Sequence, residues 1–348
     1  FPTPRLTKIE HEIEEIVIDK VAMIPQEQVM FTISRDGYVK RVSMRSYGAA
    51  NDAMTGIKEG DHLIGYGEVN TLDNILFFTS KGTYGYVPVY EVDDAKWKEI
   101  GSHINSKIKI TSDEKITDAF IVKDFKTNAY MLSITRHGLV KKTAICEYEV
   151  SRNNKTMSNM KLLEDDEVVQ TYVAYEEDEI LIASKKGYIT RYPISLIPAA
   201  SPRSKGVKAM NLVEDEIASA LIYNNDNRQL VVFSDNCACK RMKLTDIDVT
   251  GRPTKGSMLC KKVKSKPYHI AYISLHDLND EIVIANSEIH KVVSKDIPLM
   301  AKDATFSAML KGITDFYLLK ELPKVELREL PKQEEVEEED FEALSLFE

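Results

Sequence analysis

The sequence predicts an all-β protein built as a six-bladed, propeller-like ring, and three observations lead to this fold class. The stretch "VMFTISRDGYVKRVSM" has five similar partners along the chain, giving six copies with starts near residues 28, 74, 129, 179, 229 and 281. Each copy reads as an apolar run, a short polar turn and a second apolar run, which is typical of a β-hairpin. A further apolar strand, such as "HLIGYGEV" or "VVQTYVAY", follows the hairpin. An internal period of about fifty residues with three to four strands per copy indicates a ring of small antiparallel sheets.

The turns of the six hairpins share the same residue types. A hydroxyl that can bond to turn amides precedes the turn in five copies, at Ser34, Thr79, Thr135, Ser184 and Ser234. Glycine fills the turn at Gly37, Gly82, Gly138 and Gly187, where a positive φ is expected. Cys237 and Ser287 replace it in the last two copies. The sequence "CAC" at 237–239 therefore reads as a turn residue and a buried apolar position rather than a metal or redox site.

Charge is distributed unevenly along the 348 residues. The formal charge of -9 divides into -3 for residues 1–27, +2 for residues 28–320 and -8 for residues 321–348. We expect a lead-in from a missing N-terminal part at 1–27, the six-bladed ring at 28–320 and an acidic tail at 321–348. No apolar run is long enough for a membrane helix, and four scattered cysteines favour a reducing cytosol. The acidity belongs to the two ends.

Two adjacent positions after each turn are rich in basic residues. The first holds Lys40, Lys141, Lys240 and His290, and the second holds Arg41, Lys142, Arg191, Arg241 and Lys291. No acidic residue enters either position. A repeated position in a ring lies on one circumference, so these columns predict a basic belt that binds phosphates. The alternative is that they are solvated edge charges which discourage aggregation between strands.

The loops after the hairpins carry further basic clusters. "SPRSKGVK" supplies Arg203, Lys205 and Lys208, and "GRPTKGSMLCKKVKSK" supplies Arg252, Lys255, Lys261 and Lys262, followed by Lys264 and Lys266. Arg45, in the loop after the first hairpin, is included in the same expected DNA-binding set. Small residues among cations expose backbone amides and allow close approach to a phosphate backbone. We expect double-stranded DNA as the partner.

The repeated "GYVKR"-type hairpins, the acidic tail and the lead-in "IEEIVIDKVAMIPQEQVMFTISRDGYVKRVSMRSY" resemble the C-terminal domain of the A subunit of bacterial type IIA topoisomerases. This resemblance implies a β-pinwheel, a propeller-like disc whose neighbouring blades exchange a strand. It also implies that DNA bends around the basic perimeter of the disc.

Within that family, DNA gyrase carries a box resembling QRRGGKG in the loop after the first hairpin. Here the loop reads "GAANDAMTGIKEGD" from Gly48 to Asp61, without an Arg pair or a double glycine. The difference favours the topoisomerase IV branch of the family. The sequence "MRSYGA" at 44–49 also resembles the Gram-positive form of that subunit. The expected function is therefore a non-catalytic DNA-binding and DNA-bending domain that presents a DNA segment for ATP-dependent strand passage. A gyrase-type wrapping domain is the close alternative.

The resemblance implies that the catalytic residues of the enzyme lie outside this chain. We accordingly expect no catalytic or metal-binding residue here, no membrane partner, no small-molecule substrate and no cofactor in this domain, with Mg²⁺ and ATP used elsewhere in the enzyme. The remaining expected partners are the two topoisomerase IV subunits, namely the rest of the A subunit and the separate B subunit, in the bacterial cytoplasm at the nucleoid. A propeller scaffold for proteins and a propeller glycosidase are the alternatives from other classes. A glycosidase would need convergent carboxylates, which have no repeat position here.

The last residues, "KQEEVEEEDFEALSLFE" at 332–348, hold eight acids against one lysine. One interpretation is a solvated tail. The other is a segment that folds back as a DNA mimic on the basic perimeter, held there at high effective concentration.

Overall fold

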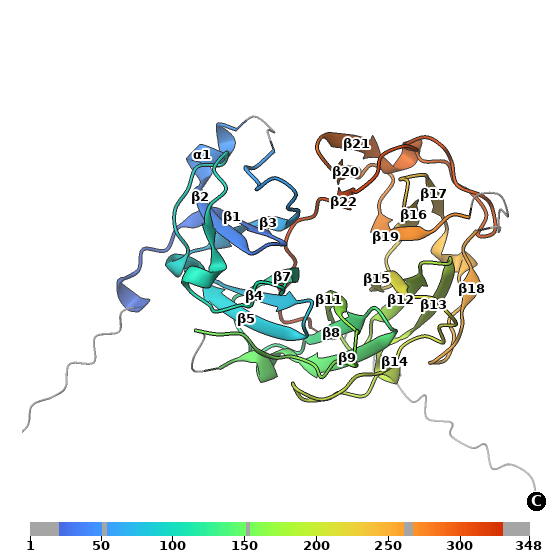
Figure 1. The fold of residues 1–348 in the computed structure, drawn as a ribbon, viewed down its shortest axis with the longest axis horizontal. Coiled ribbons are helices and arrows are strands. Elements are labelled where there is room, and N and C mark those ends of the chain that lie inside the picture. The colour runs from blue at the N-terminus through green and yellow to red at the C-terminus, as the bar shows by residue number, and fades with distance from the viewer. Residues whose placement is uncertain (1–20, 51–53, 151–153, 261–266, 330–348) are drawn as a thin grey trace, which may run out of the picture.

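The computed structural model describes residues 21–50, 54–150, 154–260 and 267–329. Within these ranges the chain forms six sheets arranged as blades around a ring (Figure 1). The sheets hold between three and five strands, and the chain passes through the blades in order from blade 1 to blade 6. The predicted all-β class and the six-bladed propeller are confirmed.

Each blade contributes three strands in a fixed chain order. The first is β1 (Gln28–Ser34), β4 (Asn74–Thr79), β8 (Tyr130–Thr135), β12 (Glu179–Ser184), β16 (Gln229–Ser234) or β20 (Glu281–Ala285). The second is β2 (Tyr38–Ser43), β5 (Thr83–Pro88), β9 (Leu139–Ala144), β13 (Tyr188–Pro193), β17 (Cys239–Met242) or β21 (Ile289–Val293). The third faces the ring's centre and is β3 (Leu63–Asn70), β7 (Ile116–Val122), β11 (Val168–Ala174), β15 (Ile217–Tyr223), β19 (Ile270–His276) or β22 (Tyr317–Leu318).

Neighbouring blades exchange a short strand at the outer edge. The loop after the second strand of a blade turns back and pairs with the second strand of the preceding blade. This strand is β6 (Ser102–His103) on β2, β10 (Met157–Ser158) on β5, β14 (Val207–Lys208) on β9 and β18 (Ser257–Met258) on β13. We call the segment between the second and third strands of a blade its exchange loop. This arrangement is the strand exchange expected of a β-pinwheel.

The hairpin turns form as their residues predict. The turn glycines all have positive φ, from 69° at Gly82 to 95° at Gly37, and Cys237 adopts 58° in their place. The preceding hydroxyl accepts a backbone amide after the turn, as in Tyr38 N to Ser34 Oγ at 3.0 Å. Local chemistry therefore accounts for the conformation of the hairpin turns.

Helices are short and lie mainly in the exchange loops. The α-helix is α1 (Met44–Gly48), and the 3₁₀ turns are η1 (Val21–Met23), η2 (Val89–Glu91), η3 (Ile104–Ser106), η4 (Ile145–Tyr148), η5 (Ile194–Leu196), η6 (Leu244–Asp246) and η7 (Ser294–Asp296).

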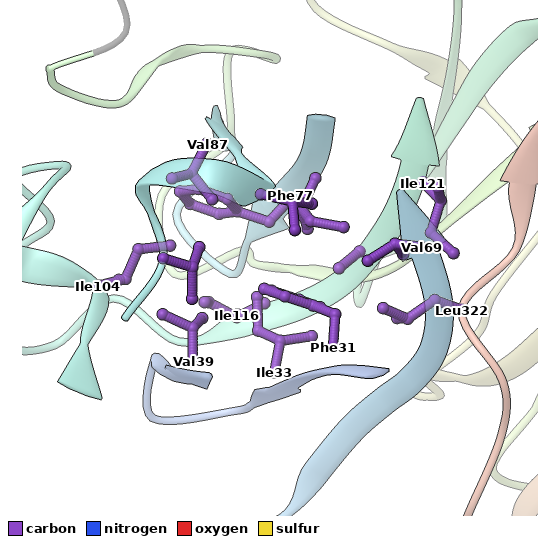
Figure 2. Close-up of a cluster of buried hydrophobic side chains, with 14 of the residues drawn as sticks. Phe31, Ile33, Val39, Val69, Phe77, Val87, Ile104, Ile116, Ile121 and Leu322 are labelled. Atoms are coloured by element: carbon purple, nitrogen blue, oxygen red, sulfur yellow. The ribbon is translucent and has the colours of Figure 1, made fainter. Parts of the chain in front are cut away.

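The hydrophobic core is divided among the seams between blades. At the seam of blades 1 and 2, Phe31 and Ile33 from β1 meet Phe77 from β4, and Ile104 from the exchange loop packs beside them (Figure 2). Comparable clusters fill the next four seams. Each blade therefore buries its faces against its neighbours, as repeat architectures require.

The packed chain continues beyond the sixth blade, so the expected boundary at residue 320 is wrong. β23 (Lys324–Val325) adds a parallel strand to β7 of blade 2, and Leu322 is buried in the first seam. Residues 321–329 belong with the ring rather than with an acidic tail. The remainder of the expected tail, and residues 1–20 of the lead-in, lie outside the described residues.

Candidate nucleic-acid interface

The first basic column points into the protein rather than toward solvent. Lys40 is fully buried, and its ammonium donates to the carbonyl oxygens of Trp97 at 2.7 Å, Gly56 at 3.4 Å and Glu99. Gly56 belongs to the exchange loop of blade 1, while Trp97 and Glu99 belong to that of blade 2. Lys40 therefore ties two successive exchange loops together.

Lys240 repeats this arrangement four blades later. Its buried ammonium donates to Lys302 O at 2.7 Å, Ala304 O at 2.9 Å, Ala301 O at 3.3 Å and Leu259 O. These oxygens again come from the exchange loops of the same blade and the next one. Burial lowers the pKa of Lys240 to about 8, while the carbonyl oxygens around it satisfy the charged form.

The residues of this column in blades 3 and 4 are also buried, while His290 in blade 6 is half-buried. Lys141 is buried against Thr143 Oγ1, and burial lowers its pKa to about 8. In blade 4, Thr190 takes the place of a lysine and lies 2.9 Å from Thr254 Oγ1 in the next exchange loop. At Lys40, Thr190 and Lys240 this column therefore contacts exchange loops, whereas Lys141 contacts its own strand.

The second basic column joins each blade to the 3₁₀ turn of the next. Arg241 donates to Ile297 O at 3.0 Å and Lys295 O at 3.3 Å, on either side of Asp296 in η7. The same role is filled in other blades by Arg41 Nη1 to Tyr90 O at 3.4 Å, Lys142 Nζ to Ile194 O at 3.4 Å and Arg191 Nη1 to Leu244 O at 3.2 Å. Nearby carboxylates complete three of these sites, at Asp94, Glu176 and Glu179. The column therefore connects neighbouring blades.

The two exceptions in this column follow the same logic. In blade 2, Tyr86 replaces the cation and donates its hydroxyl to Val150 O at 2.6 Å in the next exchange loop. In blade 6, no further blade follows, and Lys291 lies half exposed beside Glu281 of its own blade at 2.8 Å.

The prediction of a solvent-facing belt is therefore wrong for Lys40, Lys141, Lys142, Lys240 and Arg241, which are all buried. Arg41 and Arg191 are partly buried and paired with Asp94 and Glu179. The periodicity in the sequence is real, but its cause is the repeated contact between blades. A cation whose donors are already bound to protein oxygens has few left for a phosphate.

The loop cations of the predicted set do lie on the surface. Arg45, Arg203, Lys205, Lys208 and Lys255 are exposed. Arg203, Lys205 and Lys208 stand in the exchange loop of blade 4, which runs along the edge of blade 3 through β14. From residue 194 to 211 this loop has no Asp or Glu.

The exchange loop of blade 5 lies against that of blade 4 and extends its charge. Arg252 bridges them, donating from Nε to Leu196 O at 3.2 Å and from Nη1 to Lys208 O at 2.7 Å. Lys255 is exposed and lies over the Tyr188 ring at 4.6 Å. We call the residues Arg203, Lys205, Lys208, Arg252 and Lys255 the cationic rim. Lys261 and Lys262 lie outside the described residues.

The cationic rim is concentrated in one sector of the disc. The exchange loop of blade 2, at 89–115, carries five lysines and six acids interspersed along it, whereas the three acids of the blade 4 loop stand together at its end, at 214–216. Lys107 in that loop pairs with Asp93 at 3.6 Å. Equivalent loops in the ring therefore differ in how their charges are arranged, and the acid-free part of the blade 4 loop, together with the adjoining blade 5 loop, offers the more favourable surface for a polyanion.

Glycines in the exchange loops are a sequence signal that the repeat pattern alone does not reveal. Gly101 and Gly256 stand immediately before β6 and β18, with φ of 90° and 78°. A Cβ on Gly256 would lie 2.1 Å from Ile189 O, and one on Gly101 would lie 2.5 Å from Val39 O. Gly206 occupies the same place before β14. Glycines at this spacing mark where the exchanged strand passes close to the preceding blade.

Other kinds of site find less support in the structure. A central cavity of about 990 Å³ is lined by the inner strands and by residues of mixed charge. No group of three or more potential metal ligands occurs in the described ranges. Cys237 and Cys239 are buried free thiols whose pKa burial raises, to about 12 and about 11. Within the part of the chain that is described, no helix has the length and apolar character to cross a membrane.

The fold and the rim together define a strand-exchanged β-propeller domain with a cationic edge. The family model described as "DNA gyrase C-terminal domain, beta-propeller" matches residues 28–65, 73–123, 129–174, 178–224 and 228–275, which are most of the first five blades. The chain belongs to this family of DNA gyrase A C-terminal domains.

Among curated proteins, the chain is 33% identical over 292 residues to the A subunit of DNA topoisomerase 4 from Staphylococcus epidermidis, covering 84% of this chain and 36% of that protein. It is 35% identical over 272 residues to the corresponding protein of Bacillus subtilis, covering 78% of this chain and 34% of that one. The chain therefore spans about a third of the length of these relatives.

Among solved structures, the C-terminal domain of DNA topoisomerase IV superposes with a TM-score of 0.75 at 34% identity, covering 83% of this chain and 90% of that one. A DNA gyrase A C-terminal domain superposes with a TM-score of 0.66 at 20% identity, over 84% of this chain and 98% of that one. The second likeness supports the fold alone.

Proposed function

We propose that this chain binds double-stranded DNA on the cationic rim and bends it, without reading base sequence. The observation that carries the proposal is the exchange loop of blade 4, which exposes Arg203, Lys205 and Lys208 and has no acid between residues 194 and 211. Exposed cations on a curved edge follow a phosphate backbone and release its counterions. A rigid edge that contacts the backbone at several points favours a bent duplex.

We further propose that the domain acts within topoisomerase IV, holding a DNA segment for strand passage catalysed by the rest of the enzyme. The names of the curated relatives and the 34% identity to the topoisomerase IV domain support this over gyrase. The loop after the first hairpin also lacks a gyrase-type box. In this proposal the partners are the rest of the A subunit and the separate B subunit in the bacterial cytoplasm, and Mg²⁺ and ATP act outside this domain.

The test is binding to a duplex of a few tens of base pairs across a salt series. Substituting Arg203, Lys205 and Lys208 with Ala should reduce the slope of log K against log salt by about 0.9 for each lost phosphate contact. All three side chains are exposed, so the thermal unfolding midpoint should change little.

The matched control is the triple substitution of Lys96, Lys98 and Lys107 with Ala in the exchange loop of blade 2. Acids in that loop already balance these lysines, so the slope should change less. An equal reduction of the salt slope in the two triple variants would show that the blade 4 loop contributes no more to DNA binding than the blade 2 loop. No loss from the blade 4 variant would contradict the DNA-binding proposal and favour a scaffold for protein partners.

A further inference from the structure

The inner strands of the ring are joined across three seams by the same device. A side chain from one blade accepts the backbone amide of the next: Asp118 Oδ2 from Thr171 N at 2.7 Å, Gln170 Oε1 from Ala220 N at 2.8 Å and Ser219 Oγ from Ile273 N at 3.2 Å. Asp118, Gln170 and Ser219 occupy equivalent register positions, opposite Phe78, Ile134 and Ala183. We call these contacts the inner staples.

Blade 1 is held without inner staples. Its residue at the staple position is Gly65, which stands opposite Ile33 and has no side chain to offer blade 2. The amide of Tyr66, which corresponds to that of Thr171, donates instead to Lys320 O at 3.4 Å. Residue 320 lies after the last blade. A distant segment of the chain therefore holds blade 1, whereas inner staples join blades 2 to 5.

That segment, residues 317–328, is called the strap. It begins as β22 on β20 of blade 6, and Figure 1 shows the chain passing from β22 along the inner side of the ring. Leu322 N donates to Tyr66 O at 2.7 Å in blade 1, and Ile121 N of blade 2 donates to Pro323 O at 2.9 Å. The strap therefore links blades 6, 1 and 2 through its backbone.

Side chains fix both ends of the strap. Lys320 pairs with the buried carboxylate of Asp118 at 2.7 Å. Arg328 pairs with Asp178 and Glu177 and stacks on the Tyr175 ring at 3.7 Å. The backbone of Arg328 also exchanges two hydrogen bonds with the Asn128 side chain, at 2.8 and 3.0 Å. These contacts extend the strap to the segments that precede β8 and follow β11 of blade 3.

The inner face of the ring is shaped to receive the strap. Leu322 is 4% exposed and packs near Val69 and Ile121 (Figure 2). A Cβ on Gly65 would lie 2.6 Å from Leu322 Cδ2. The glycine that removes the inner staple therefore also creates the space for Leu322.

The seam between blades 6 and 1 depends on the strap for its core. Its buried apolar residues are Leu63, Ala285 and Tyr317, with Leu319 packed against them. Tyr317 and Leu319 are themselves strap residues, and Tyr317 also stacks with His62 of blade 1 at 4.7 Å. Without the strap, little buried apolar surface would hold this seam together.

We propose that the inner groove formed by β3, β7, Asn128 and Asp178 is a peptide-binding site. Its occupant is the strap, an extended peptide that the groove recognises through the side chains of Lys320, Leu322 and Arg328. The ring stays closed between blades 6 and 1 while this site is filled and opens there when the strap leaves. This inference concerns the closure of the disc and does not depend on DNA binding.

The first experiment measures amide hydrogen exchange in the 348-residue chain carrying Leu322→Asp. A buried carboxylate in the first seam should expel the strap. Exchange of Tyr66 N and Ile121 N should then accelerate by at least about tenfold, while Ala220 and Ile273, whose inner staples do not contact the strap, keep their protection. Leu327→Asp is the matched control because Leu327 is 66% exposed on the same strap. Unchanged exchange at Tyr66 and Ile121 in Leu322→Asp would overturn the proposal.

If Leu322→Asp unfolds the whole chain, Arg328→Ala applies the same test outside the core. Faster exchange confined to the strap and its partner amides would support the proposal, and unchanged exchange would overturn it.

The second experiment adds a synthetic peptide of residues 316–329 to the Leu322→Asp protein. The peptide should bind the variant, restore protection at Tyr66 and Ile121 and bind the unsubstituted chain at least about tenfold more weakly, because the site there is already filled. A peptide with Leu322→Asp is the control. Equal binding of the two peptides, or none by either, would show that the groove is not a peptide site.

Discussion

The second strands of the blades and their exchange loops carry the same kinds of side chain but use them in opposite ways. Lys240 and Arg241 on β17 are buried and donate to carbonyl oxygens of neighbouring blades. Lys205 and Lys208 in the exchange loop of blade 4 are exposed in a segment free of acids. In the sequence both sets appear as clusters of neighbouring basic residues. The comparison teaches that a periodic charge in a repeat protein can serve the contact between repeats rather than an external ligand.

The largest expected effect separates the two sets by stability. Lys240→Met should lower the free energy of unfolding by about 3 kcal/mol, because it leaves buried carbonyl oxygens without a donor. Lys243→Met, three residues away at an exposed position, should change it by less than about 0.5 kcal/mol. Chemical denaturation of both variants measures the difference. Equal stabilities would show that the carbonyl contacts of Lys240 contribute little.

The next effect tests how closely the exchange loop approaches the preceding blade. Gly256→Ala should cost about 2 kcal/mol, since it places a Cβ against Ile189 O in a left-handed conformation. Gly251→Ala, where a Cβ meets nothing within 4 Å, is the control in the same loop. Thermal unfolding of the two variants is the measurement. A stable Gly256→Ala protein would contradict this tight crossing.

A smaller effect tests whether the buried column takes part in DNA binding. Arg241→Gln should reduce stability by about 1 to 2 kcal/mol by weakening the contacts to Ile297 and Lys295. The salt slope of DNA binding should stay unchanged below the unfolding transition, in contrast to the blade 4 triple variant. A slope reduced by about 0.9 would show that Arg241 contacts a DNA phosphate, as the sequence analysis predicted.

The smallest expected effect concerns residues 332–348, which lie outside the described part of the chain. If this acidic segment competes with DNA for the cationic rim, deleting it should tighten DNA binding, most strongly at low salt where screening is weak. Binding curves of the intact and shortened chains across a salt series measure this. Identical curves would make the segment a solvated tail without a role at the rim.

Much of the fold was predictable because its signals are local. The turn hydroxyl at Ser34 and the glycine at Gly37 lie within one hairpin, and the fifty-residue period counts the blades. The exposure of the loop cations was also predictable, since an acid-free stretch with Gly, Ser and Pro is a surface segment in most settings. The basic columns were placed on the surface because a strand pattern does not show which face a neighbouring blade will cover.

The sequence by itself determined the hairpins, their turns, the number of blades and the identity of the loop cations, since each of these depends on residues close together in the chain. Tertiary structure decided the burial of Lys40 and Lys240, because the carbonyl oxygens around them come from exchange loops about 16 to 64 residues away. It also decided the course of the strap, which joins Arg328 to Asn128 across 200 residues. The strap leaves no periodic trace in the sequence, because it occurs once in the chain. The lysine column is periodic, but its burial cannot be read from the sequence because its partners are backbone groups that every residue possesses.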